Sequence, residues 1–282
     1  MMKRPDFTEY WSGVAEEVAK AKGEKAEVSE LPIRSTGGST GYAVTIIGTG
    51  GYRLFAWYSV PRGRGPFPAL LQTPGYGSVV GVPAYEPRQK YVVLALCHRG
   101  QRKSDKPYAA SYPGLLTDGI DNPDKYVFRD IVADCLSAFD FLLSRREVDK
   151  KRIAVTGNDL AYMTAGLRPQ TSAVLVTGEL LFRAVGERRT RTSEYPIEEF
   201  NDYLRTFPRR RDAVEATLGL FDPLGFASMV KAKVMISCAA PAKGYAAPLA
   251  KLVRQGDLRV AEGRGHTDHV AEEKWIDGAL AG

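Results

Sequence analysis

The stretch RIAVTGNDLAYMTAG, residues 152–166, comes closest in this sequence to a catalytic motif. An apolar run enters Gly157 and small residues follow it, a pattern typical of a strand, a tight turn and a helix. A nucleophile elbow has the frame G-x-S-x-G, with the serine at the tip of such a turn. Here Asp159 stands at the serine position and Ala161 at the last glycine, so the turn carries a carboxylate where a hydroxyl is expected.

The carboxylate at position 159 leaves two chemical interpretations open. In the first, Asp159 is itself a nucleophile and forms an ester intermediate that a water molecule, activated by a histidine, then hydrolyses. In the second, Asp159 is structural, because an aspartate at a helix N-terminus meets the helix dipole and spare backbone N–H groups. Neither interpretation allows a serine-type mechanism at this position, since that mechanism needs a hydroxyl that a histidine can deprotonate.

The rest of the composition disfavours other nucleophiles and a membrane location. The three cysteines, Cys97, Cys135 and Cys238, lie singly inside apolar runs without CxxC spacing, which predicts reduced, buried thiols and a cytoplasmic location. No stretch of eighteen apolar residues occurs, so no membrane span is expected. The sequence gives no reason to expect a metal or an organic cofactor.

The net charge of +6 arises partly from two basic segments, residues 187–191 (ERRTR) and 208–212 (PRRRD). Such segments are one signature of nucleic-acid or anionic-ligand binding. However, acidic residues flank both segments, and no aromatic residue interleaves within them to stack on bases. A solvated surface is therefore favoured, and no nucleic-acid partner is expected.

The elements that must position Asp159 alternate between strands and helices. Residues 42–61 contain two strand-like runs joined by a glycine-rich turn, which predicts a β-hairpin. Further on, the pattern predicts strands at 67–74, 90–100, 152–157, 172–178, 233–241 and 257–263, and helices at 124–149, 244–256 and 268–282. This order predicts the α/β class, with one domain over residues 1–282 and a mostly parallel, doubly wound sheet. Residues 179–232 are mostly helical and polar, and we expect them to form a cap above the carboxyl ends of the strands.

Several motifs in this order resemble those of one enzyme family. They are WYSVPRGRGPFPALL (57–71), TPGYGS (73–78), HRGQRKSD (98–105), the long helix and elbow strand at 126–157, YPIEEFNDYLRTFP (195–208) and LGLFDPLGFASMVKAKVMIS (218–237). Together they resemble the acetyl xylan esterase and cephalosporin C deacetylase family of α/β-hydrolases over nearly the whole chain. The resemblance implies an α/β-hydrolase fold with an N-terminal hairpin and a helical cap insertion.

The resemblance also implies roles for individual residues. It places the oxyanion hole at the backbone N–H groups of Tyr76, in the G-Y-G turn, and of Leu160, after the nucleophile position. The late G-H pair implies His266 as the catalytic histidine. The nucleophilic serine is replaced by Asp159, and the acid that orients the histidine is replaced by Ala242, in a segment without a carboxylate.

With two triad members gone, the resemblance implies a degenerate triad and no normal acetyl esterase activity, since loss of a triad group costs about 10⁴-fold in rate. The favoured interpretation is an esterase-like homologue, a pseudoenzyme that acts as a ligand-binding or scaffold subunit. Tyr162 agrees with it, because the family keeps a small residue there and a ring would fill the acyl pocket. The alternative is an active hydrolase of a small ester, halo-acid or related substrate. In that case Asp159 is the nucleophile, His266 the base and Glu179 the acid that orients it.

Partners follow from the same resemblance. We expect a small-molecule ligand or substrate under the cap formed by residues 179–232. Members of the resembled family commonly form ring-shaped hexamers, which implies self-association of this chain into a hexamer or another assembly. A membrane partner is not expected.

Overall fold

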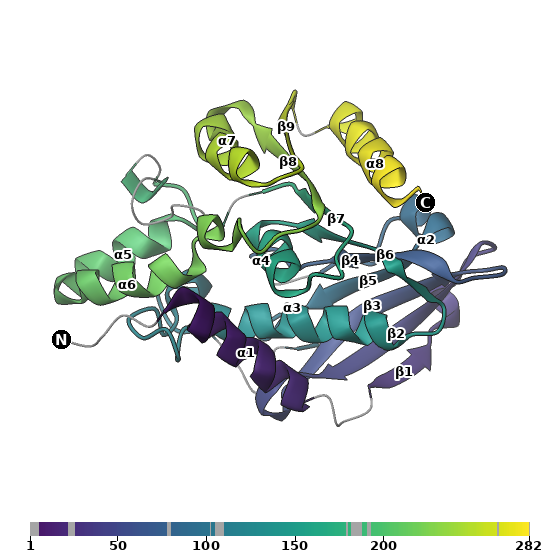
Figure 1. Cartoon of the computed structure of the whole chain (residues 1–282). Coiled ribbons are helices and arrows are strands. Elements are labelled where there is room, and N and C mark those ends of the chain that lie inside the picture. The colour runs from purple at the N-terminus through teal and green to yellow at the C-terminus, as the bar shows by residue number, and fades with distance from the viewer. Residues whose placement is uncertain are drawn as a thin grey trace.

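The computed structural model describes residues 6–21, 26–77, 80–101, 103–104, 110–178, 180–181, 188–190, 193–263 and 265–281, with the backbone alone at positions 188 and 245. One sheet of nine strands runs through these residues in the order β1-β2-β3-β5-β4-β6-β7-β8-β9. The architecture is shown in Figure 1.

The sheet has an antiparallel side and a parallel side. β1 (Glu27–Glu30), β2 (Ser39–Ile47) and β3 (Arg53–Pro61) pair antiparallel, and β3 also pairs antiparallel with β5. All further pairs are parallel; their strands are β5 (Val92–Cys97), β4 (Phe67–Gln72), β6 (Val148–Gly157), β7 (Ala173–Val176), β8 (Lys233–Ala239) and β9 (Gly256–Ala261). The prediction of a mostly parallel α/β sheet with an N-terminal hairpin is confirmed.

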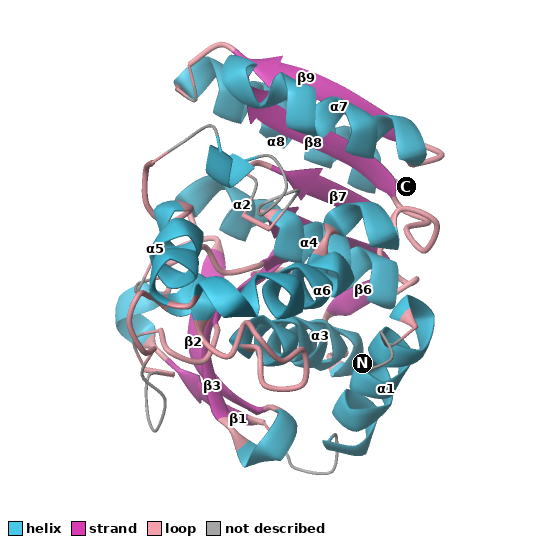
Figure 2. Cartoon of the chain, turned by 90° about the vertical axis from the view of Figure 1, so that its left-hand side faces the viewer, coloured by secondary structure: helices cyan, strands magenta, loops and turns pink. Residues whose placement is uncertain are grey.

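Helices cover both faces of the sheet, and the two layers differ in size. The larger layer contains α1 (Phe7–Ala21), α3 (Val127–Ser144), α4 (Asp159–Leu167) and α7 (Lys243–Leu252), and the smaller one contains α2 (Tyr85–Lys90) and α8 (His266–Leu280). Figure 2 shows α3 and α4 in front of the strands, with α2 and α8 on the far side. The predicted helices are present with other bounds. The helix predicted over 124–149 is α3, which ends at Ser144, and residues 148–149 already belong to β6; α7 ends at Leu252 rather than near residue 256.

Strand residues alternate between these two layers because successive side chains point to opposite faces of a sheet. In β4, Ala69 and Leu71 belong to the main core, whereas Leu70 belongs to a second and much smaller cluster. The second cluster contains eight buried residues: Leu70, Tyr91, Val93, Ala154, Ala173, Leu175, Ile276 and Leu280. The α2–α8 face is thus covered far less completely than the α3–α4 face.

The described part of the expected cap is helical, as predicted. It contains α5 (Glu198–Thr206) and α6 (Arg211–Phe221), which Figure 1 shows together at one end of the sheet. The unpredicted helix α1 supports α6, because the buried Trp11 ring donates a hydrogen bond of 2.8 Å to the carbonyl oxygen of Leu220. Among the described residues, no helix combines the length and the apolar character needed to cross a membrane.

Candidate functional site

The strand-to-helix turn at the end of β6 forms as the sequence predicts. Gly157 has φ 144°, and a Cβ atom there would lie 2.1 Å from the hydroxyl oxygen of Thr73, so only glycine fits. Asn158 is the N-cap of α4, and its side-chain oxygen accepts a 2.9 Å hydrogen bond from the Leu160 N–H. Asp159 is the first residue of the helix.

Asp159 points into the protein. The residue is 1% exposed, and its Oδ2 atom accepts hydrogen bonds from the backbone N–H groups of Leu180, at 2.8 Å, and Leu181. These two residues follow β7, so the carboxylate joins the start of α4 to the segment that leads from β7 toward the cap. Buried N–H groups need such an acceptor, and an ionised carboxylate is a strong one.

The structure describes two of the three residues of the predicted catalytic set, Asp159 and His266. His266 is exposed at the first turn of α8, and within the described residues it makes no hydrogen bond with Asp159. Glu179 lies outside the described residues. The catalytic roles of Asp159, His266 and Glu179 therefore stay predictions, and the described contacts of Asp159 are structural.

The two predicted oxyanion-hole residues are both engaged within the chain. The Leu160 N–H donates to Asn158, as described above, and is therefore already used as part of the helix cap. Tyr76 is half-buried in the turn after β4, and its hydroxyl donates to Oε1 of Glu199. The oxyanion role predicted for Tyr76 belongs to its backbone N–H, and it stays a prediction.

Two further positions singled out in the sequence, Ala242 and Tyr162, lie within the described residues. Directly after β8 come Ala240, Pro241 and Ala242, so the strand end carries no ionisable side chain there. Tyr162, one turn after Asp159, is fully buried in the main core, and its hydroxyl has no hydrogen-bond partner among the described residues. The Tyr162 ring therefore occupies buried volume one helical turn from Asp159.

Gln101 holds the Tyr76 turn, a role that the sequence did not reveal. The side chain is 1% exposed, and its Nε2 donates to the carbonyl oxygens of Gly75, at 3.0 Å, and Gly77, at 2.6 Å. The R-G-Q segment was visible in the sequence only as part of the family resemblance. Two carbonyls held from both sides of Tyr76 fix the path of this turn.

Arg99, in the same segment, anchors the loop to α3. Its guanidinium makes two hydrogen bonds to the fully buried Asp134, at 3.0 and 2.7 Å, and one to Asp130 at 2.7 Å. The pairing is bidentate, which is the strongest geometry for an arginine and a carboxylate. The loop that carries Gln101 is therefore fixed through a buried ion pair.

Glu199 is the second residue that sequence reasoning missed. The side chain is 1% exposed on α5 and accepts hydrogen bonds from the Tyr76 hydroxyl and, at 2.8 Å, from the Leu116 N–H. Burial raises the pKa of Glu199 to about 7; the Leu116 N–H opposes this shift and Asp202 adds to it. In the sequence Glu199 stands among other acids in a polar segment, so nothing distinguished it from a surface residue.

Other candidate nucleophiles and bases are Cys97, His98 and His269. Burial raises the pKa of the Cys97 thiol to about 11 and lowers the pKa of His98 to about 4, so both are uncharged near neutral pH. His269 is on α8, with its Nδ1 atom 3.7 Å from the Glu272 carboxylate. Within the described ranges, no group of three or more His, Cys, Asp or Glu side chains is placed to hold a metal ion.

Known proteins are similar to this chain over most of its length. The family model described as acetyl xylan esterase (AXE1) matches residues 1–247. A curated relative, the acetyl esterase Axe7A of Xylanibacter ruminicola, is 23% identical over 248 residues, which is 82% of this chain and 55% of the relative. The chain thus spans about half the length of that relative.

Two solved structures are similar over almost the full length. The acetyl xylan esterase from Paenibacillus sp. R4 superposes with a TM-score of 0.84 at 25% identity, covering 99% of this chain and 96% of that chain. Acetyl xylan esterase 1 from Thermoanaerobacterium sp. JW/SL YS485 has a TM-score of 0.83 at 23% identity, with the same coverage. The similarity to the Thermoanaerobacterium enzyme shows that the two chains share a fold.

Proposed function

Because the chain belongs to the acetyl xylan esterase family, we propose that it keeps the hydrolase fold without normal esterase activity and acts as a ligand-binding or scaffold subunit. The observation that carries this proposal is the buried Asp159, whose carboxylate accepts two backbone hydrogen bonds where the family resemblance implies a serine. Through Oδ2 this carboxylate links the start of α4 to the segment after β7, which is a structural role.

The chemistry of acyl transfer supports the proposal. A serine esterase needs a hydroxyl, a histidine that accepts its proton and a carboxylate that orients the histidine. Position 159 has no hydroxyl, and Ala242 has no carboxylate. His266 is exposed and makes no hydrogen bond with Asp159 within the described residues.

The hydrogen bond already made by the Leu160 N–H also supports the proposed lack of esterase activity. Preorganised N–H donors are worth about 10²–10³-fold in rate when they point at the developing oxyanion. The Leu160 N–H instead donates a hydrogen bond of 2.9 Å to the side-chain oxygen of Asn158. A substrate would have to displace this cap before the N–H could stabilise a negative charge.

A second candidate is a hydrolase in which Asp159 is the nucleophile. It is favoured by the position of this carboxylate at the tip of the strand-to-helix turn, where a nucleophile would stand. Both described backbone hydrogen bonds of Asp159 are made by Oδ2, so Oδ1 would be the attacking oxygen, and His266 would have to turn inward. A small ester, a halo-acid or a related substrate would be its substrate class.

Trapping of a covalent intermediate separates the two candidates. Wild type, His266→Ala and Asp159→Asn are each incubated with p-nitrophenyl acetate, chloroacetate and a small epoxide, and intact masses are measured. We expect no adduct on residue 159 in any sample. An adduct that maps to Asp159, accumulates in His266→Ala and is absent from Asp159→Asn would overturn the proposal in favour of the nucleophile.

A further inference from the structure

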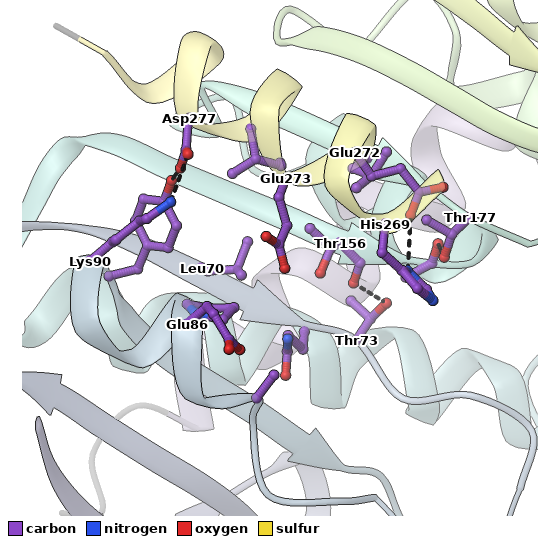
Figure 3. A pocket seen from close by; sticks show the side chains of 17 residues that line it. Leu70, Thr73, Glu86, Lys90, Thr156, Thr177, His269, Glu272, Glu273 and Asp277 are labelled. Carbon is purple, nitrogen blue, oxygen red and sulfur yellow. Dashed lines mark hydrogen bonds and ion pairs between the residues drawn. The ribbon is translucent and has the colours of Figure 1, made fainter. Parts of the chain in front are cut away.

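A cavity of about 580 Å³ opens on the thinly covered face of the sheet, between α2 and α8. We call it the α2–α8 groove; Figure 3 shows the side chains that line it. Its floor is formed by β4, β6 and β7 near their carboxyl ends, with Gly157 at the elbow end. Neither Asp159, His266 nor Tyr76 lines it. The volume is that of a site for a small organic molecule, about 300–1,000 Å³.

The floor of the groove changes from apolar to polar along the strands. Leu70 lies on the α2–α8 face of β4, and two residues later Gln72 lies on the same face. Gln72 pairs in register with Thr156 of β6, and Thr156 pairs with Leu175 of β7. An amide and a hydroxyl therefore stand side by side at the end of an apolar surface.

These two polar side chains are open to a partner from outside the described chain. Gln72 and Thr156 are half-buried, and neither side chain makes a hydrogen bond with any residue in the described part of the chain. Polar groups inside a protein are normally paired. In a groove of this volume, a ligand or ordered water can supply the missing partners.

The rim of the groove carries an excess of negative charge. Lys90 is neutralised by Asp277, with 2.7 Å between Nζ and Oδ2. Glu86 on α2 and Glu273 on α8 both line the groove, and neither forms an ion pair with a cation among the described residues. Figure 3 shows both carboxylates directed into the space between the two helices. The complementary ligand carries a positive charge.

From this arrangement we propose that the α2–α8 groove binds a small organic cation, a protonated primary amine on an apolar body. The ammonium group lies between Glu86 and Glu273, and the apolar body packs on Leu70, Leu175 and Ile276. A hydroxyl or carbonyl at the other end of the ligand completes the hydrogen bonds of Gln72 and Thr156. This goes beyond the proposed function, because the groove can bind the amine whether or not the elbow is catalytic.

The experiment compares three ligands that share one apolar body and differ in charge: 2-phenylethylamine, 2-phenylethanol and phenylacetate. Isothermal titration calorimetry with the full chain measures each affinity at low and at high salt. We expect the amine to bind about tenfold more tightly than the alcohol, phenylacetate to bind more weakly still, and the preference for the amine to shrink at high salt.

Single substitutions then test whether the amine binds in the α2–α8 groove. Glu86→Gln and Glu273→Gln should each weaken amine binding about threefold, as expected for an exposed charge pair, and leave the alcohol unaffected. Glu16→Gln, on the exposed side of α1, is the matched control and should change nothing. Ala84→Trp, at an exposed position of the groove rim, should abolish binding of the amine and the alcohol by filling the space.

Two results would overturn the proposal: no saturable amine binding, or amine binding that Ala84→Trp leaves intact. Equal affinity for the amine and the alcohol would also overturn it, since the charge would then play no part. The proposed function is tested separately. An adduct on Asp159 or ester turnover would contradict it, and neither result depends on the groove.

Discussion

At the residue scale, three buried carboxylates connect separate segments of the chain. Asp159, Asp134 and Glu199 are all 1% exposed or less, and each accepts hydrogen bonds from backbone N–H groups, a guanidinium or a hydroxyl. A buried carboxylate is tolerated only with such partners, because desolvation disfavours its charged form. Each of the three therefore binds one segment of the chain to another.

The structural role of Asp159 predicts a large loss of stability when the carboxylate is removed. Asp159→Ala leaves the N–H groups of Leu180 and Leu181 without this acceptor, which should lower the free energy of unfolding by about 2–4 kcal/mol. His266→Ala, on an exposed side chain, should stay within about 0.5 kcal/mol of wild type. Urea denaturation of both variants measures the difference. Equal stability of the two variants would contradict the structural role.

The buried ion pair of Arg99 gives a second prediction. Arg99→Ala leaves the fully buried Asp134 without its guanidinium and should cost about 3–5 kcal/mol in the free energy of unfolding. Arg53 forms an exposed pair with Glu27 at 2.8 Å, so Arg53→Ala should cost no more than about 1 kcal/mol. Thermal and urea unfolding of both variants test the contrast, and similar losses for the two would refute it.

At the element scale, the cap helix α5 is fixed to the turn that carries Tyr76. Glu199 provides this connection, because one of its oxygens binds the Tyr76 hydroxyl and the other the Leu116 N–H. Gln101 holds the same turn from the opposite side through Gly75 and Gly77. The cap is thereby attached at the point where the family resemblance implies an oxyanion hole.

The raised pKa of Glu199 predicts how stability depends on pH. The folded protein holds the Glu199 proton with a pKa of about 7, whereas in the unfolded chain a glutamate has a pKa of about 4.3. The folded state binds more protons between these values, so this residue makes stability fall as pH rises from about 4.3 to about 7, and has no further effect above that.

Glu199→Gln should remove this slope, because glutamine resembles the protonated carboxyl. Urea unfolding between pH 4 and pH 8 should show a flatter profile for Glu199→Gln than for wild type. Glu215→Gln, at an exposed position of α6, should keep the wild-type slope. Parallel profiles for wild type and Glu199→Gln would show that Glu199 does not titrate in this range.

The elements near the elbow could be predicted from the sequence because their signals are local. The parallel strands are apolar runs, and Gly157 followed by Asn158 and Asp159 is a typical strand-to-helix turn. Helix α1 could also have been found, since Trp11, Val14 and Val18 lie on one helical face. The six-residue α2 gives no such period, and it was missed.

The contacts that define the site could not be predicted, because they are long-range. The hydrogen bond between Tyr76 and Glu199 joins residues 123 positions apart, and Asp159 is held by a segment 21 to 22 positions away. The sequence indicated that Asp159 is a helix N-terminal residue and left open which way it points. That direction depends on the path of the chain after β7.

At the scale of the whole molecule, the fold is that of the acetyl xylan esterase family, while the residues at its elbow differ from what that resemblance implies. The fold is shared over 99% of the chain with the Paenibacillus sp. R4 enzyme. A fold of this kind is compatible with many functions, so function has to be argued from the site. Here the described contacts of the elbow are structural, and the α2–α8 groove is lined by the Gln72 and Thr156 side chains, which make no hydrogen bond with a described residue.

Steady-state release of p-nitrophenol from p-nitrophenyl acetate measures whether the elbow hydrolyses acetyl esters. Wild type and Asp159→Asn are assayed beside the Paenibacillus sp. R4 acetyl xylan esterase as a positive control. We expect wild type and Asp159→Asn to give the same rate, at least about 10⁴-fold below an ordinary enzyme turnover of ~10 s⁻¹. Saturable wild-type turnover within about 100-fold of that value, lost in a folded Asp159→Asn, would contradict it.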